Sequence, residues 1–287
     1  MVCAPWWTVI SRAVLWRFVD NGVLRSGWAG EHGMIEPSIA RVRDYWLGGA
    51  HNSDSDRKFA DYTAVCAPHI PYLVRAQRVL LGRMVRYLVG QGVRQFLDLG
   101  SGVPTIDHVH QVAQAIEPAS RVVYVEIDPG LVEDGRNLIA GTDNVAFLQA
   151  DIREPDQVLE LCGLLDLSKP VALLMIETLL HIPDCDDPGT MIANYLAALC
   201  SGSYLGLSHF AEHEELLAAF AMFDGMNLGT RPLVNLRSRE ELAGFFAGLE
   251  LVEPGVVPVP LWRPDSDEDL GRNPDRAPMY AGLGRKP

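Results

Sequence analysis

The chain of 287 residues is 48% hydrophobic and 21% charged, so it holds enough apolar material for a large folded core and wholesale disorder is excluded. It carries 24 basic and 37 acidic residues, a net charge of −13, and a surface of this sign repels nucleic-acid phosphates and anionic membranes. We therefore expect no nucleic-acid partner and no membrane association. The sequence leaves the oligomeric state open.

The first 33 residues differ from the remainder, because Trp6, Trp7, Trp16 and Trp28 all lie there. The apolar stretch 4–19 contains two arginines, so it is too short and too charged to span a bilayer, and it lacks the features of a secretory signal. An amphipathic interfacial helix is an alternative. We predict that residues 1–33 are an extension upstream of a natural start at Met34.

The five cysteines include no pair at C-x-x-C spacing, and their number is odd. This pattern favours neither a disulfide framework nor a zinc site. We therefore predict no metal site, and we expect reduced thiols in a cytoplasmic protein.

Residues 37–92 have a helical pattern with a break at Gly48-Gly49, and the clearest helix is expected over 71–89. We predict that residues 34–92 form a helical cap. Short apolar runs then alternate with helical stretches, which predicts a mostly parallel sheet covered by helices on both faces. The expected strands are 95–99, 121–125, 145–148, 171–176 and 203–208, and the expected helices are 105–117, 129–140, 155–165 and 188–200.

The pattern changes after Phe210. Helices are expected near 212–222 and 238–249, and apolar runs near 250–262 and 279–284 are expected to close the sheet as an antiparallel edge. The acidic, proline-rich segment 263–278 is expected to be an exposed loop. The predicted fold class is α/β, with the sheet built by residues 93–287.

A glycine-rich turn follows the first predicted strand, within the segment Phe96–Thr105. Gly100 and Gly102 allow the backbone to approach a ligand closely. Asp98, two residues earlier, would repel a pyrophosphate but suits a ligand that carries an ammonium and a sulfonium. Thr105 replaces the third glycine of the dinucleotide fingerprint, which weakens that interpretation.

Two further acids follow the next two predicted strands. Glu126 can accept hydrogen bonds from both hydroxyls of a ribose, and Asp151 can accept one from an adenine amino group. The carboxyl ends of parallel strands meet at one edge of a sheet, so we expect these acids and Asp98 to line one crevice. Together they indicate a nucleoside with a positively charged tail, which is S-adenosylmethionine.

The segments Phe96–Thr105, Val122–Pro129 and Val145–Arg153 resemble the class I S-adenosylmethionine-dependent methyltransferases. Within that class, the chain from about Pro37 onward is similar to a bacterial group called S-adenosyl methyltransferases, whose substrate is unassigned. This narrower resemblance is also carried by segments 40–49, 237–242 and 250–258. The resemblance implies a Rossmann-like sheet, a helical amino-terminal cap and S-adenosylmethionine as cofactor. It implies cofactor contacts for Asp98, Gly100, Ser101, Gly102, Glu126, Ile127, Asp128, Asp151 and Ile152. The group commonly has Asp where this chain has Glu126.

The predicted cap holds a polar cluster around its glycine break, which includes Arg41, Tyr45, Gly49 and Asn52. A cap that closes over a crevice needs a hinge and donors for a ligand carboxylate. We therefore predict that Arg41, Tyr45 and Gly49 contact the cofactor, with a purely structural loop as the alternative. The nearby acids Asp54, Asp56 and Asp61 miss the EF-hand spacing, and a solvated acidic face is expected.

The segment Leu179–Asp184 resembles an L-H-x-P-D stretch that faces the acceptor in many small-molecule methyltransferases. We predict that His181 is catalytic, as a base or as a group that orients the acceptor; a loop histidine with a structural hydrogen bond is the alternative. Glu177 could face the methionine ammonium, or be a solvated turn residue. His209 is a weaker catalytic candidate.

His108 and His110 follow the glycine-rich turn, and we expect surface or capping roles for both. The predicted function is methyl transfer from S-adenosylmethionine to a small-molecule acceptor. Two alternatives are a non-catalytic S-adenosylmethionine-binding protein and an NAD-dependent oxidoreductase.

Overall fold

The computed structural model describes residues 37–214, 216–217, 235–271 and 273–287. The predicted extension 1–33 and most of the helix predicted near 212–222 lie outside these residues. Within the described ranges, no helix combines the length and the apolar character needed to cross a membrane.

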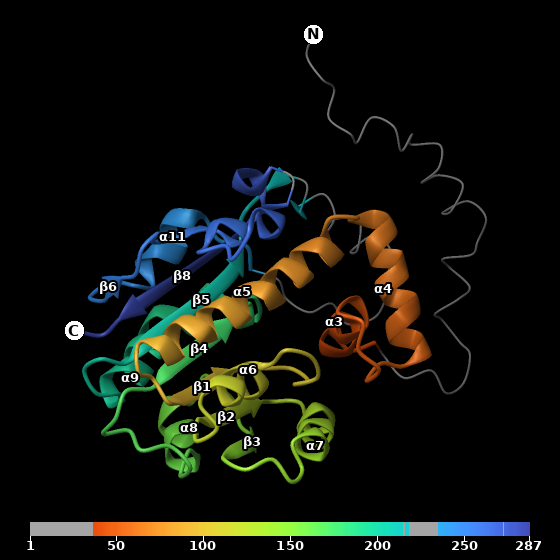
Figure 1. Ribbon diagram of the computed structural model, residues 1–287. Coiled ribbons are helices and arrows are strands. Elements are labelled where there is room, and N and C mark those ends of the chain that lie inside the picture. The colour runs from red at the N-terminus through yellow and green to blue at the C-terminus, as the bar shows by residue number, and fades with distance from the viewer. Residues whose placement is uncertain (1–36, 215, 218–234, 272) are drawn as a thin grey trace, which may run out of the picture.

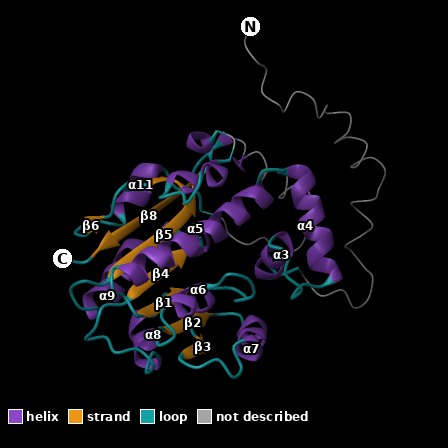
Figure 2. Ribbon diagram, in the orientation of Figure 1, coloured by secondary structure: helices purple, strands orange, loops and turns teal. Residues whose placement is uncertain are grey.

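The described residues build one sheet of eight strands in the order β3-β2-β1-β4-β5-β8-β6, with β7 paired to β8 (Figure 2). The strands from β3 to β5 are parallel, and β8 pairs antiparallel with β5, β6 and β7. This confirms the predicted parallel sheet with an antiparallel edge. The strands are β1 (Gln95–Leu99), β2 (Arg121–Glu126), β3 (Val145–Gln149), β4 (Ala172–Ile176), β5 (Tyr204–Phe210), β6 (Glu250–Leu251), β7 (Val257–Pro258) and β8 (Met279–Arg285).

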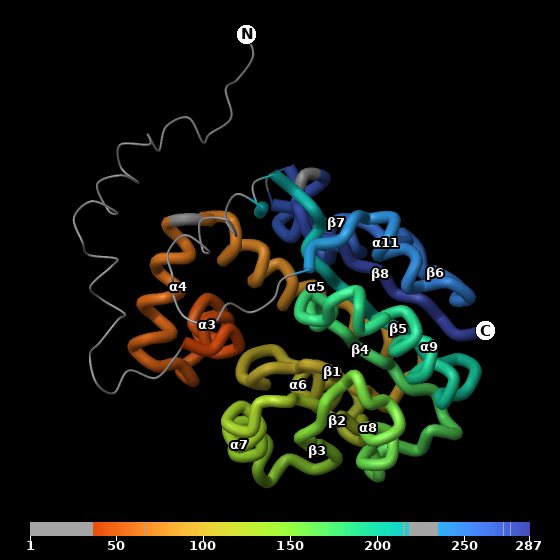
Figure 3. The backbone as a smooth tube through the Cα atoms, turned by 180° about the vertical axis from the view of Figure 1, so that it is seen from behind, coloured from red at the N-terminus to blue at the C-terminus, as the bar shows by residue number. Residues whose placement is uncertain are grey.

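Helices cover both faces of the sheet (Figures 1 and 3). Successive strand side chains enter different cores: Phe96 joins the core of α5, α6 and α7, whereas Leu97 joins the core of α8, α9 and α11. The helices are α3 (Ile39–Trp46), α4 (Asp54–Cys66), α5 (Ile70–Gly90), α6 (Val109–Ile116), α7 (Pro129–Leu138), α8 (Pro155–Leu161), α9 (Pro188–Ala198) and α11 (Arg239–Gly244). Short 3₁₀ turns are η2 (Thr178–His181), η3 (Asp184–Asp186), η4 (Val259–Leu261), η5 (Asp267–Leu270) and η6 (Pro274–Arg276).

Several predicted helices were too long, because local capping sets their true ends. The helix expected over 105–117 begins only at Val109: Asp107 has a φ of 47°, and His108 is the N-cap, its Nδ1 accepting a hydrogen bond from the Val109 amide. Likewise α8 and α11 end earlier than the expected 165 and 249. The predicted 263–278 loop is confirmed apart from two 3₁₀ turns.

The predicted cap contains three helices. Helices α3 and α4 lie beyond the carboxyl ends of the parallel strands, whereas α5 also packs on α6 and β4 (Figure 1). Asp56 fixes the join between the first two, because its Oδ1 accepts a hydrogen bond from the Ser38 amide (2.8 Å) and its Oδ2 one from the Ser53 amide (2.8 Å). Asp56 is buried, so the expectation that it lies on a solvated acidic face is wrong.

Candidate functional site

A cavity of about 560 Å³ lies at the carboxyl ends of β1, β2 and β4 and the loop after β3, under residues of α3 and α5. The structure brings together here every cofactor-binding residue predicted outside the cap, together with His181. They are Asp98, Gly100, Ser101, Gly102, Glu126, Ile127, Asp128, Asp151, Ile152 and His181.

The glycine-rich turn needs glycine at two positions. Gly100 and Gly102 have φ values of 69° and 64°, in the left-handed region that disfavours side chains. A Cβ on Gly100 would also lie 2.4 Å from the Thr178 methyl carbon, and the Thr178 hydroxyl donates to the Leu99 carbonyl (2.5 Å). The turn after β1 is therefore packed directly against the turn after β4.

Glu126 is held by the turns on both sides of it. Its Oε2 accepts a hydrogen bond from the Gly102 amide (3.1 Å), and its Oε1 accepts one from the Ile127 amide (2.8 Å). Oε1 also accepts a longer hydrogen bond from the Asp128 amide (3.3 Å). Oε2 has one partner, so the carboxylate can still accept a hydrogen bond from a ligand there.

Two further acids at this edge, Asp128 and Asp151, have structural partners. The Asp128 Oδ1 caps α7, accepting hydrogen bonds from the Gly130 and Leu131 amides (2.7 and 3.0 Å). Asp151 pairs with Arg153 (2.6 Å), and the hydrogen bond from this guanidinium lowers the pKa of the carboxyl. Arg153 also lines the cavity, a position that no pattern in the sequence indicated.

Asp98 is buried beneath the turn. Its burial raises the pKa of the carboxyl to about 7, an effect that Glu126 strengthens and Arg78 opposes. His108 Nδ1 lies 3.7 Å from Asp98 Oδ2, but burial lowers the pKa of His108 well below its ordinary value. The imidazole is therefore neutral and provides no ion pair for Asp98.

The raised pKa of Asp98 predicts a pH-dependent stability. The Asp98 carboxyl holds its proton more tightly in the folded state than in the unfolded state, where its pKa is near 3.8. The contribution of this proton to the free energy of unfolding is therefore complete below about pH 3.8 and is lost as the pH rises through about 7. Asp98→Asn remains neutral at every pH. The variant's free energy of unfolding, relative to the unsubstituted protein, should therefore rise between about pH 5 and about pH 8 in denaturant titrations. An equal difference at both pH values would contradict this assignment.

The two histidines after the turn are buried, which corrects the expected surface position. His108 has the predicted capping role, whereas the His110 ring packs on Tyr124, with its Nδ1 2.8 Å from the Tyr124 hydroxyl. Burial lowers the pKa of His110 and raises that of Tyr124 well above its ordinary value, so this pair is neutral.

The cap residues predicted to bind the cofactor do not line the cavity. Arg41 pairs with Asp134 (2.6 Å), the Tyr45 hydroxyl donates to Asp61 (3.4 Å), and Gly49 packs against Asp44 so closely that a Cβ would overlap it. Asn52 also hydrogen-bonds Asp44, through its Nδ2 (2.8 Å).

A different face of α3 reaches the cavity. Ala40, Arg43, Asp44 and Leu47 recur at intervals of three and four residues and line it, together with Gln77, Arg78 and Leu81 of α5. Arg41 and Tyr45 point elsewhere because they lie on another face of the same helix.

An ion pair joins the cap to the sheet. Arg43 of α3 pairs with Glu177, which follows β4 with a φ of 67°, and also donates to Gln77. The Gln77 Nε2 in turn donates to the Ser208 hydroxyl on β5 (2.9 Å). Glu177 is thus a buried, paired residue of the cavity wall and not a solvated turn residue.

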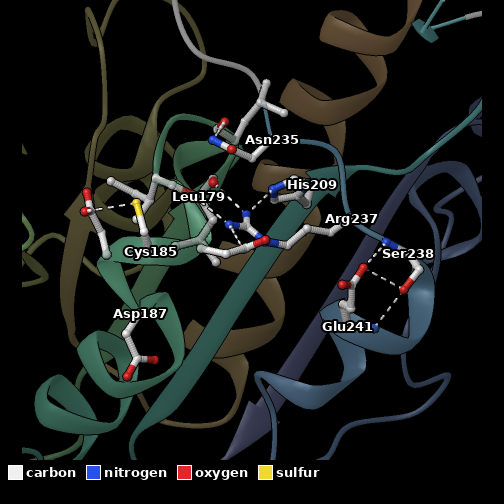
Figure 4. Close-up of polar contacts among 12 residues, drawn as sticks. Leu179, Cys185, Asp187, His209, Asn235, Arg237, Ser238 and Glu241 are labelled. Carbon is white, nitrogen blue, oxygen red and sulfur yellow. Dashed lines mark hydrogen bonds and ion pairs between the residues drawn. The ribbon is translucent and has the colours of Figure 1, made fainter.

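The loop that carries His181 is held by one buried guanidinium (Figure 4). Arg237 donates to the Leu179 carbonyl (2.7 Å), the Ile182 carbonyl (2.7 Å) and Asp184 Oδ1 (2.8 Å). These acceptors lie on both sides of His181, so Arg237 fixes the path of the backbone there.

His209 is a fourth acceptor of Arg237 and is not part of the cavity wall. Its Nε2 lies 2.9 Å from Arg237 Nη1, and its Nδ1 lies 2.6 Å from the Phe210 carbonyl. Burial lowers the pKa of His209 to about 4, which keeps the ring neutral and able to accept from the guanidinium. These contacts are structural and lie outside the cavity wall, which corrects the prediction of His209 as a weaker catalytic candidate.

Comparison with known proteins gives the family. A family model described as S-adenosyl methyltransferase matches residues 32–287. The chain belongs to the S-adenosyl methyltransferase family. It is accordingly an S-adenosylmethionine-dependent methyltransferase, and this donor, not a nicotinamide, is its cofactor.

Solved structures agree with this assignment. A DUF574 family protein from Streptomyces avermitilis is 35% identical with a TM-score of 0.80, over 88% of this chain and 98% of that one. A candidate methyltransferase from Thermobifida fusca is 37% identical with a TM-score of 0.78, over 88% of this chain and 95% of that one. The plantazolicin methyltransferase BamL, solved with S-adenosylhomocysteine, is 9% identical with a TM-score of 0.50 over 86% of this chain and 95% of that one, which shows a likeness of fold alone. A search of curated proteins found no match to this methyltransferase.

Proposed function

We propose that this methyltransferase acts on a small molecule that binds between α3, α5 and the loop after β4, beside a cofactor that lies along the ends of β1, β2 and β3. The observation that carries the proposal is the single cavity that both regions share, with acids on the sheet side and Arg43, Gln77 and His181 on the other.

The residues present fit the cofactor. Glu126 would accept hydrogen bonds from the ribose, and the glycine turn would allow close approach of the ligand. Ile127, whose surface is 56% exposed although it is a large apolar residue, would pack with Ile152 on the adenine, next to Asp151. Asp98 would face the ammonium, whose positive charge favours the ionised form of a carboxyl with a pKa near 7.

The sulfonium of the bound donor supplies a methyl group that is already activated for displacement. This chain's residues then have to hold an acceptor in line and keep water away. We propose that His181 orients the acceptor or takes its proton, with the Arg237 contacts fixing the loop around it. The Arg43–Glu177 pair would hold α3 over the reacting atoms.

The acceptor class can be tested with methyl-labelled S-adenosylmethionine and a bacterial extract separated into metabolites, proteins and nucleic acids. Label transferred only into the metabolite fraction is expected, and it should fall strongly with His181→Ala while S-adenosylhomocysteine binding persists. Label in protein or nucleic acid would contradict the proposed acceptor. Label in no fraction would favour a protein that binds the cofactor without catalysis.

Removal of Glu126 should weaken cofactor binding. Glu126→Ala is expected to reduce the affinity for S-adenosylhomocysteine by about 1–3 kcal/mol, the usual effect of losing hydrogen bonds to a charged group. Titration calorimetry would measure this change, with Glu133→Ala, an exposed acid of α7, as the matched control. An unchanged affinity in Glu126→Ala would show that the ribose is bound elsewhere.

We also propose that the protein is cytoplasmic. The support is the sequence pattern of its cysteines, together with the free thiols of Cys162, Cys185 and Cys200.

A further inference from the structure

One arginine of the cavity wall has hydrogen-bonding capacity that the described residues leave unused. Arg78 lies on α5 and lines the cavity, and its Nη1 is buried without a hydrogen-bond acceptor in the part of the chain that the structure describes. A buried guanidinium N–H without an acceptor is unfavourable, so this atom calls for a ligand oxygen.

The charges around Arg78 do not neutralise it in the way that other arginines of the site are neutralised. Arg43 pairs with Glu177, and Arg153 pairs with Asp151 and Asp186. Arg78 has no such ion pair among the described residues. It interacts electrostatically with Asp98, which is itself largely protonated below neutral pH, and more weakly with Tyr124 and Asp107, and it is repelled by Arg43. Burial lowers the pKa of Arg78 to about 10, so the guanidinium still carries its charge at neutral pH.

We propose that Arg78 binds the α-carboxylate of the cofactor's methionine part. This rests on the cofactor position proposed above. A guanidinium and a carboxylate form short, charge-assisted hydrogen bonds in a paired geometry, and the adenosine part offers no anion for this role.

The neighbours of Arg78 favour the cofactor over an anionic acceptor. Most of the electrostatic neighbours of Arg78 lie on the cofactor side: Asp98 on β1, His108 before α6 and Tyr124 on β2, whereas Arg43 of α3 repels it from the other side. The proposed acceptor region is instead bounded by Glu177 and His181, with the Arg43–Glu177 pair on that side. Arg78 would therefore bind one end of the amino-acid moiety while Asp98 faces its ammonium.

The test compares two ligands that differ only in this carboxylate. Titration calorimetry on the full chain would use S-adenosylhomocysteine and its decarboxylated analogue, which keeps the adenosine, the thioether and the amine. The unsubstituted protein should prefer S-adenosylhomocysteine by about 10- to 100-fold, the range for hydrogen bonds to a charged group. Arg78→Met should abolish this preference while changing the affinity for the analogue less than about twofold.

Two further variants separate binding from folding. Arg78→Lys keeps the charge without the paired donors and should retain part of the preference. Arg75→Met, an exposed arginine on the same helix, should keep all of it. The readout in each protein is the ratio of its affinities for the two ligands. If Arg78→Met lowers both affinities equally, the ratio is unchanged and the proposal is contradicted. The proposal is also contradicted if the unsubstituted protein binds both ligands equally. An unsubstituted protein that binds neither ligand contradicts the proposed cofactor site itself.

Discussion

Arg237→Met should lower the free energy of unfolding by about 3–5 kcal/mol. The side chain is buried at 3% exposure, and its removal leaves the Leu179 and Ile182 carbonyls and the His209 Nε2 without their donor. The pair with Asp184 adds little, because that carboxylate is 77% exposed and screened by water. Equilibrium unfolding in urea, followed by circular dichroism, would measure the change.

Arg285→Met is the matched control. Arg285 pairs with Glu250 at the surface, where the two side chains are 42% and 62% exposed, so its loss should change stability by less than about 1 kcal/mol. Similar effects for the two substitutions would show that Arg237 does not hold the His181 loop through buried hydrogen bonds.

Gly100→Ala should destabilise the protein by about 2–5 kcal/mol and reduce cofactor affinity in parallel. Two effects add: the left-handed φ of 69° and the 2.4 Å overlap of the new methyl group with Thr178. Movement of Thr178 would also disturb its hydrogen bond to the Leu99 carbonyl and thus the turn that lines the cavity. Thermal and urea unfolding, with S-adenosylhomocysteine titration, would report both effects.

Gly141→Ala separates the two contributions. Gly141 has a φ of 81°, but nothing lies within 4 Å of an added Cβ, so only the backbone strain of about 1–2 kcal/mol applies. The double variant Gly100→Ala/Thr178→Ser removes the clashing methyl group and should recover part of the loss. Equal effects of Gly100→Ala and Gly141→Ala would exclude the steric contribution.

The sheet could be predicted because its strands are short apolar runs bounded by turn residues. The site acids could be proposed because each lies near the carboxyl end of such a run. The ends of helices could not, since they depend on single caps such as His108. Which residues of the cap line the cavity could not be predicted for a related reason. Arg41 and Arg43 are equivalent in the sequence, and only the rotation of α3 against the sheet decides which of them meets Glu177.

The arginines of α5 show the same limit. Arg75, Arg78, Arg83 and Arg86 all lie off the apolar face of the helix, and the sequence pattern does not distinguish them from one another. Arg83 is in fact 3% exposed and donates to the Val259 carbonyl, whereas Arg78 reaches the cavity. These positions depend on where the long helix crosses α6 and β4, which involves residues distant in sequence.

The alternation of side chains between two apolar cores has a consequence for strand alignment. A shift of β1 by one residue would exchange Phe96 with the two leucines between these cores, so the apolar residues of the strand barely distinguish the correct pairing from its neighbour. Asp98 is the only charged residue of β1, and a slip would turn it away from Arg78 and into the leucine-rich side. The same carboxyl that the ligand would meet thus also penalises misalignment of the central strand.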